Sequence, residues 1–345
     1  MNQEGLLVDQ GQTKKQVVIV AMTGHLLLDF AGPADVFNSA NKVLELQGRL
    51  DGYNVLVASP TANKSVSNSV GIEINCTLSV MEIERGIDTL LIAGSNNIQN
   101  LDDPDYQEFY DWLSATHPHT RRVGSICAGA FALAKAGLLN GKRATTHWDR
   151  SELLQKNYPL IQVDSNPFYV SDGKVYTSGG VSSGIDLALS LVEEDYGKEV
   201  AMQVARRLVF YLNRPGFQIQ FGNLLPEYEN HNIAGKLRTW MIDHLHEPLD
   251  VMRLAEHINM SPRNFTRVFH KQTGIPPAKY VEKVRVETAR KYLEDTDVSL
   301  EQIAEKCGLG GLVSMRRTFL RHLMITPSDY RRAFRTSLAD VMTLT

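Results

Sequence analysis

The sequence predicts a chain of two domains: a three-layer α/β domain built on a parallel sheet, followed by an all-α domain with two helix-turn-helix units. Three observations carry this prediction. A chain of 345 residues exceeds one typical domain. Short apolar runs alternate with amphipathic stretches over residues 16–217, and from Ile233 onward the sequence reads as helices separated by turns. We therefore expect domains over 16–217 and 233–335, joined by a linker over 218–232.

Short continuous apolar runs mark the strands of the first domain, as expected for strands covered on both faces. They lie at residues 16–22, 53–59, 87–94, 121–126 and 174–180. The expected helices begin at about Pro33 and run to residue 46, then cover 106–116, 128–139, 184–197 and, as one long run, 198–212. Proline suits a first helical turn. This alternation predicts a parallel sheet whose ligands bind beyond the carboxyl ends of the strands.

The composition is that of an ordinary globular protein, with 43% hydrophobic and 22% charged residues. Average glycine and proline contents exclude a collagen-like or largely disordered chain, and uncharged stretches of about a dozen residues are too short to span a bilayer. The N-terminus lacks the basic-then-apolar pattern of a secretion signal. Three widely spaced cysteines suggest neither disulfides nor a zinc cluster. We expect a cytoplasmic protein without membrane association, metal or cofactor.

Charge is distributed unevenly along the chain. Residues 1–230 carry 18 Lys and Arg against 26 Asp and Glu, a net charge of −8, whereas residues 231–345 carry 18 against 13, a net charge of +5. A basic domain favours a polyanionic partner. On charge alone a solvated surface without a partner explains these counts equally well, so the motifs must decide.

The basic third of the chain contains an internal repeat. Residues 254–280 can be laid over residues 303–330 with one residue inserted in the second copy, which pairs Ala255 with Ala304, Phe269 with Phe319, Pro277 with Pro327 and Tyr280 with Tyr330. Each copy has a small residue where two helices approach closely, then a short turn, then a helix that ends at a core-facing aromatic. This is the helix-turn-helix pattern, whose second helix enters the major groove of DNA.

The expected base-reading residues lie on these second helices, opposite the core-facing aromatics. Ser261 is the expected N-cap of the first of them and Pro262 its first-turn residue. Lys271 and Lys279 are better placed for phosphates, which position the protein without reading sequence. Arginine pairs bidentately with guanine, and Ser or Thr bonds several bases. The expected readers are Arg263, Thr266 and Arg267 in the first copy and Val313, Ser314, Arg316 and Arg317 in the second.

Residues 233–335 resemble the AraC/XylS-type DNA-binding domain. The motifs that carry the resemblance are SPRNFTRVFHKQTG, the linker helix RVETARKYL and the closing TPSDYR. Two features depart from the family pattern: Leu309 stands where an aromatic is usual, and Gly310–Gly311 stands where a Ser N-cap is usual. We therefore expect the second reading helix to begin less firmly, and Cys307 to be a buried apolar residue.

Cys127 stands out in the first domain, because GSICAGAFALAKAGLL places it between a strand and a helix, with Gly124 and Gly129 on either side. Glycines there permit a sharp turn that projects the side chain between them. A thiol at a helix N-terminus has its thiolate stabilised by the helix dipole. A small residue in a tight turn without further function is the alternative interpretation.

This stretch resembles the cysteine turn of the PfpI/ThiJ superfamily, whose domains are flavodoxin-like and similar to class I glutamine amidotransferases. The resemblance extends to LLLDFAGPADVF, ATTHW and TSGGVSSGIDLALSLV, and Asp29 matches the acidic residue that faces the cysteine. With the C-terminal domain, this is the layout of GlxA-family transcriptional regulators, covering residues 16–335. The segment RRLVFYLNRPGFQIQF looks like the interdomain segment of that family.

The resemblance leaves two classes of function open for this site. Proteases of the superfamily carry His directly after the cysteine, where this chain has Ala128, and AGSN at 93–96 departs from their oxyanion loop. We therefore expect no enzyme but a ligand sensor, whose pocket contains Asp29, Gly94, Cys127, Ala128, His147 and Ser182 or Ser183. The alternatives are a hydratase or hydrolase of the isocyanide hydratase type using Cys127, Asp29 and His147, a redox sensor at Cys127, and a pocket that only holds a dimer together.

The resemblance to GlxA-family regulators also implies partners. These are a double-stranded DNA operator, a small polar metabolite such as an amino acid or a quaternary amine, and RNA polymerase. It further implies a homodimer, a location on the nucleoid in the cytoplasm, and activation of catabolic genes.

Overall fold

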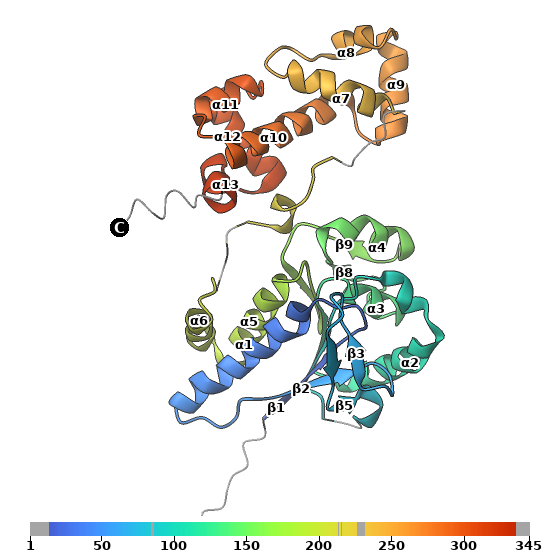
Figure 1. Cartoon of the computed structure of the whole chain (residues 1–345), viewed down its shortest axis with the longest axis vertical. Coiled ribbons are helices and arrows are strands. Elements are labelled where there is room, and N and C mark those ends of the chain that lie inside the picture. The colour runs from blue at the N-terminus through green and yellow to red at the C-terminus, as the bar shows by residue number, and fades with distance from the viewer. Residues whose placement is uncertain (1–13, 84–85, 213, 215, 226–231, 336–345) are drawn as a thin grey trace, which may run out of the picture. The chain divides into compact units, whose positions relative to one another are not determined.

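The computed structural model describes residues 14–83, 86–212, 214, 216–225 and 232–335. It divides the chain into two compact units, Met1–Arg214 and Pro215–Thr345, each described here by itself (Figure 1). Within the described ranges, no helix has the length and apolarity needed to cross a membrane.

The first unit is built on a seven-stranded sheet with strand order β10-β11-β7-β6-β1-β2-β5. All neighbouring strands are parallel except the edge pair β10 and β11, so the expected parallel sheet is confirmed. In register, Val18 of β1 lies between Leu56 of β2 and Leu90 of β6. The strands are β1 Lys15–Val20, β2 Tyr53–Ser59, β5 Leu78–Ser79, β6 Thr89–Ile92, β7 Arg122–Ser125, β10 Tyr169–Asp172 and β11 Val175–Ser178.

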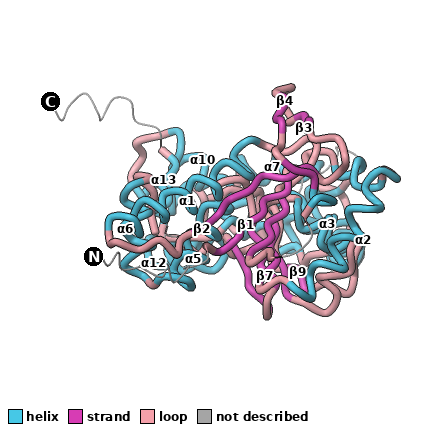
Figure 2. The backbone as a smooth tube through the Cα atoms, turned by 90° about the horizontal axis from the view of Figure 1, so that it is seen from below, coloured by secondary structure: helices cyan, strands magenta, loops and turns pink. Residues whose placement is uncertain are grey.

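Helices cover both faces of this sheet, as expected for three layers. Helices α1, α5 and α6 lie on one face, and α2 and α3 lie on the other (Figures 1 and 2). Two small two-stranded sheets complete the unit: β3 Ser65–Ser67 with β4 Glu73–Asn75, and β8 Arg143–Ala144 with β9 Gln162–Val163. The helices are α1 Leu27–Leu46, α2 Gln107–Thr116, α3 Gly129–Lys135, α4 Ser151–Asn157, α5 Ser183–Tyr196 and α6 Lys198–Arg207.

Three helix boundaries differ from the expectation. Helix α3 ends at Lys135 instead of residue 139, because Gly137 adopts a left-handed φ of 75° and the Leu138 N–H bonds back to the Leu133 carbonyl at 2.9 Å. Helix α1 begins at Leu27, so Pro33 lies inside it, because packing on α5 keeps the preceding turn helical: a Cβ at Gly32 would lie only 2.9 Å from Ile185. The expected long helix 198–212 ends at Arg207. There Val209 adopts a left-handed φ of 52°, and the Phe210 N–H bonds back to the Ala205 carbonyl at 2.9 Å, a C-cap that stops the helix.

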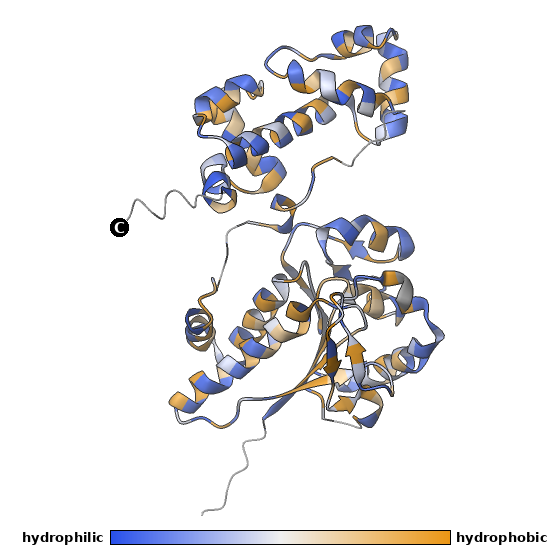
Figure 3. Ribbon diagram, viewed as in Figure 1, coloured by the Kyte–Doolittle hydropathy of each residue, from blue (hydrophilic) through white to orange (hydrophobic). Residues whose placement is uncertain are grey.

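In the part of it that the structure describes, the second unit contains helices separated by turns, as the sequence predicted. Its apolar residues form two clusters: one contains Phe265, Phe269 and Tyr280, and the other contains Phe319 and Tyr330. In Figure 3, apolar and polar residues alternate around each of these helices, as expected for short amphipathic elements. The helices are α7 Ile233–Asp243, α8 Val251–His257, α9 Pro262–Thr273, α10 Pro277–Asp295, α11 Leu300–Lys306, α12 Leu312–Leu323 and α13 Pro327–Phe334.

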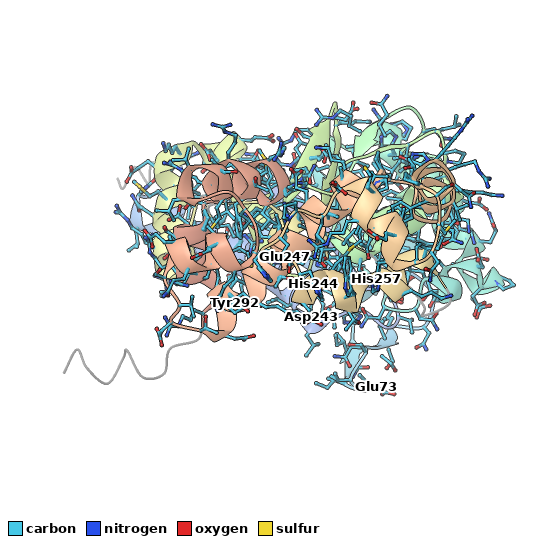
Figure 4. The ribbon with its side chains drawn as sticks, turned by 90° about the horizontal axis from the view of Figure 1, so that it is seen from above. Glu73, Asp243, His244, Glu247, His257 and Tyr292 are labelled. Atoms are coloured by element: carbon cyan, nitrogen blue, oxygen red, sulfur yellow. The ribbon has the colours of Figure 1, made fainter. Side chains whose placement is uncertain are left out.

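Two histidines of this unit stack on the same tryptophan. Figure 4 shows His244 and His257 close together, and both rings stack on Trp240, with centroids 4.7 and 4.1 Å away. The indole thus packs the end of α7 against α8, which gives these histidines a structural role.

Candidate ligand pocket and DNA-reading surface

The turn between β7 and α3 holds Cys127 in an unusual backbone conformation. Its φ is 54°, in the left-handed region that non-glycine residues seldom adopt. The Cys127 N–H donates to the Gly179 carbonyl at 3.0 Å, and the Thr146 hydroxyl donates to the Cys127 carbonyl at 2.9 Å. Gly129 permits close contact with β6, because a Cβ there would lie 2.2 Å from the Ile92 carbonyl oxygen. The expected sharp strand-to-helix turn is therefore present.

Asp29, Gly94 and Ala128 lie together at this turn. A Cβ at Gly94 would lie 2.8 Å from the Ala128 nitrogen and 3.2 Å from Asp29 Oδ2, so only glycine fits between them. Gly94 follows the carboxyl end of β6 and Cys127 that of β7, which is where ligands of parallel sheets bind. Asp29 is 1% exposed, and its Oδ1 has no hydrogen-bond partner among the described residues.

The electrostatics of the pair oppose a reactive thiolate. Burial, and secondarily the Asp29 carboxyl, raises the pKa of the Cys127 thiol far above its usual range, against the Ala128 N–H. The Ala128 N–H at the start of α3 stabilises the thiolate, as expected of a helix terminus, but burial of a side chain that is 7% exposed outweighs this effect. Burial likewise raises the pKa of Asp29 to about 7, although the Leu26 and Gly94 backbone groups lower it.

His147 lies beside the glycine turn that follows β11. A Cβ at Gly180 would lie 2.9 Å from the His147 ring, so the imidazole packs on this backbone. Its Nδ1 lies 2.6 Å from Asp149 Oδ1, an interaction that fixes the ring orientation. Thr146, the preceding residue, is the one that contacts Cys127 through its hydroxyl. His147 is thus held by Asp149 and Gly180 next to the segment that contacts the cysteine turn.

Ser182 and Ser183 have a different partner. They accept hydrogen bonds from the Arg214 guanidinium at 3.1 and 3.2 Å. Arg214 also forms an ion pair with Asp186 at 2.6 Å and lies 3.9 Å from the centre of the Phe168 ring. Burial raises the pKa of Asp186 to about 6, against the lowering effect of Arg214. The structure therefore places these serines at the start of α5 with a cation, and Asp29, Gly94 and Ala128 at the cysteine turn.

The repeat in the second unit extends to its backbone. Asn259 and Gly308 occupy equivalent positions in the two turns, with left-handed φ angles of 55° and 60°. The reading helices also end alike, with left-handed C-caps at Gly274 and Met324. Helix α9 begins at Pro262 as expected, although the N-cap Ser261 makes no side-chain capping bond.

Helix α12 begins without a polar N-cap, and the reason lies in its backbone. Gly310 and Gly311 have φ angles of 69° and 88°, which a serine would adopt only with strain. The departure from the family pattern is therefore a different turn geometry. The helix still forms over twelve residues because Met315 and Phe319 on its inner face are fully buried.

The expected reading residues lie on the outer faces of α9 and α12, and all are exposed except the half-buried Ser314. The Thr266 hydroxyl donates to the Pro262 carbonyl at 2.9 Å, and Arg267 donates to Asn264 at 2.8 Å, so both are tied to their own helix. Among the described residues, the side chains of Arg263, Arg316 and Arg317 make no hydrogen bond or ion pair. These three guanidinium groups are available to a partner.

Sequence reasoning missed Thr146, Asp149 and Arg214. Thr146 lies in the quoted ATTHW segment and Asp149 directly follows it, yet a threonine hydroxyl facing a backbone carbonyl leaves no sequence signal. Arg214 pairs with Asp186, which lies 28 residues away in the chain, and such pairings become visible only when the fold is known.

Comparison with known proteins places two family models on the chain. A helix-turn-helix domain model matches residues 254–333, and the DJ-1/PfpI family model matches residues 15–194. The HTH-type transcriptional regulator CdhR of Pseudomonas aeruginosa is 28% identical over 315 residues, 90% of this chain and 89% of that protein. The HTH-type transcriptional regulator GlxA of Rhizobium meliloti is 25% identical, over 92% and 96%. The isonitrile hydratase of Pseudomonas putida is 30% identical over 183 residues, 53% of this chain and 73% of that enzyme.

Proposed function

This chain belongs to the DJ-1/PfpI family and carries a helix-turn-helix domain, and on that premise we propose that it is a sequence-specific DNA-binding transcriptional regulator controlled by a small polar metabolite. The observation that carries the proposal is the duplicated reading helix. Helices α9 and α12 share a left-handed C-cap and a buried aromatic, Phe269 in α9 and Phe319 in α12, and both expose arginines on the outer face. Relatives aligned over nine-tenths of this chain carry regulator names.

The exposed cations of the second unit divide into arginines that read bases and lysines that contact phosphates. Arg263, Arg267, Arg316 and Arg317 supply the planar donors that pair with guanine. Lys271 and Lys279 are exposed cations that suit phosphate contacts, which fix register without reading sequence. A basic unit with both kinds of contact binds specific DNA tightly and binds other DNA in a strongly salt-dependent way.

The effector pocket lies at the cysteine turn, beyond the carboxyl ends of β6 and β7. Asp29 supports this role, because a carboxyl with a pKa near 7 can donate or accept a hydrogen bond at neutral pH. The same edge of the sheet also carries Gly94, Cys127, Ala128 and His147. The effector can shift the protein between two arrangements only if it binds one of them more tightly than the other. A homodimer, contacts with RNA polymerase and activation of catabolic genes complete the proposal.

An enzyme of the hydratase type is the second candidate, and the left-handed backbone of Cys127 favours it, because strained residues gather at functional sites. Against it stand the burial and the raised pKa of the thiol, which must be a thiolate to act as a nucleophile. Cys127→Ser separates the two. A sensor keeps DNA binding and most of its response, whereas a hydratase loses all turnover of isonitriles.

Substitution of single reading residues tests the DNA-binding assignment. Arg267→Ala should cost roughly 1–3 kcal/mol on the preferred site and relax one base preference, whereas Lys271→Ala should weaken all sequences alike. Binding titrations on selected and scrambled duplexes measure both effects. If both variants bound like the wild type, the placement of α9 in the groove would be wrong.

A further inference from the structure

The segment that enters the second unit is packed against it rather than hanging free. Residues 218–225, called the strap here, begin with a short 3-10 turn, Gln218–Gln220, and end with two adjacent leucines. Leu224 is buried in the core cluster of the second helix-turn-helix unit, and Leu225 in that of the first. The strap thus inserts one anchor into each half of the domain. The sequence gives no hint of this, because the segment has no periodicity.

Helix α10, which joins the two halves, holds the backbone of the strap. Lys283 Nζ donates to the Leu224 carbonyl at 3.1 Å, and the Leu225 N–H donates to Glu287 at 2.9 Å. Arg290 donates to the carbonyls of Gly222 and Gln220 at 2.6 and 2.9 Å. These three α10 side chains are spaced four and three residues apart, so they share one face of the helix.

The opposite face of α10 carries a second connection between the halves. Arg285 lies two residues from Lys283 and therefore about 200° around the helix. It donates to the carbonyls of Leu245 and Glu247 at 3.2 and 3.0 Å. Gly308, in the turn of the other half, contacts this point, since a Cβ there would lie 2.0 Å from the Leu245 oxygen. The two halves are thus joined on both sides of α10, by a direct contact and by the strap.

We propose that the strap is a positioning element that fixes the mutual orientation of the two helix-turn-helix units, and so sets the half-site spacing the protein accepts on DNA. The inference rests on the proposed function, because orientation matters only if α9 and α12 read one duplex together. Without the strap, the two halves would be joined by α10 and by the contact at Leu245 on one side of it, and they could pivot about that side. Leu224, Leu225, Lys283 and Glu287 supply the second connection and are the specificity-determining residues of this device.

The test uses the full-length chain and duplexes that it selects in vitro from a random library. One base pair inserted between the half-sites moves the second half-site by about 3.4 Å and about 35°. A rigid domain then loses the contacts of one reading helix, and the wild type should bind the inserted duplex about tenfold to a hundredfold more weakly. Leu224→Ala with Leu225→Ala should reduce this discrimination to less than about threefold.

Two further variants separate positioning from folding. Lys283→Met with Glu287→Met removes both hydrogen bonds to the strap, together with the ion pair of Glu287 with Arg238 at 2.7 Å, but keeps the apolar anchors. The domain should therefore retain its helicity while spacing discrimination falls. Asn223→Ala changes an exposed strap side chain that none of these contacts uses, and it should behave as wild type. Circular dichroism and affinity for a single half-site confirm that each variant is folded.

The outcomes distinguish this inference from the proposed function. If the full-length wild type selects no sequence at all, the proposed function fails. If it selects a two-part site, and a folded strap variant still rejects the inserted duplex as strongly as the wild type, the strap does not set the spacing and the inference is overturned.

Discussion

Replacing Asp29 by asparagine should change how the stability of the first unit depends on pH. Burial raises the pKa of this carboxyl from 3.8 to about 7. Between these values the folded unit keeps a proton that the unfolded chain has lost, so its free energy of unfolding falls as the pH rises. Each pH unit in that interval costs about 1.4 kcal/mol. Between pH 5 and pH 8 the wild type should therefore lose about 3 kcal/mol through this group.

The asparagine side chain is neutral at every pH, so the variant lacks the pH-dependent contribution that Asp29 makes to the free energy of unfolding. Relative to the wild type, its free energy of unfolding should rise by about 3 kcal/mol from pH 5 to pH 8. The fixed cost of the substitution does not change this difference, because the position of Oδ1 lacks a hydrogen-bond partner equally at both pH values. Hydrogen exchange of the buried amides of β1 and β6, corrected for its intrinsic pH dependence, reports the stability of this unit alone.

Asp35→Asn is the matched control, since Asp35 is an exposed carboxylate on the same helix. As a surface substitution it should change the unfolding free energy by no more than about 0.5 kcal/mol. If Asp29→Asn shifted the stability equally at pH 5 and pH 8, the description of Asp29 as a buried carboxyl that keeps its proton would be refuted.

Three other substitutions or probes test separate parts of the account. Arg122→Met should lower the stability of the first unit by about 3–5 kcal/mol, because Arg122 and its partner Asp195, 2.5 Å apart, are both 2% exposed. Arg121→Met removes a side chain that also contacts Asp195 but is itself 44% exposed, so it should cost less, about 1 kcal/mol, by the same exchange measurement. Gly308→Ala should lower the melting temperature of the second unit far more than Gly274→Ala, because both have a left-handed φ but only Gly308 faces a backbone oxygen; equal effects would contradict the contact with Leu245. Iodoacetamide should alkylate native Cys127 much more slowly at pH 8 than the same residue in urea, as followed by mass spectrometry, and rapid native labelling would revive the nucleophile interpretation.

Much of the fold could be predicted from the sequence because the signals are local. Buried parallel strands are continuous apolar runs, and most turns of the second unit carry Gly or Pro. The misplaced boundaries have causes that the residue types do not show. Helix α1 extends past Pro33 through its packing on Ile185, and α6 ends because Val209 adopts a left-handed φ that valine seldom adopts.

The candidate site could be predicted only in part, because contacts between segments that are distant in the chain leave no local signal in the sequence. The cysteine turn has a strong local signature, so its geometry follows from the sequence. The protonation state of the Cys127 thiol does not follow from the sequence, because burial by residues far away in the chain determines it. The strap and the Arg214 ion pair likewise join segments that lie apart in the sequence, and their partners emerge only from the fold.

The central claim is that α9 and α12 read DNA. Its most direct test is the salt-dependent binding of the full-length chain to the DNA upstream of its own gene, compared with a scrambled duplex of equal length. The account predicts a specificity ratio above roughly a thousandfold, with affinity falling steeply as salt rises. Weak and equal binding to both duplexes, with and without candidate metabolites, would contradict it and turn attention to the chemistry of Cys127.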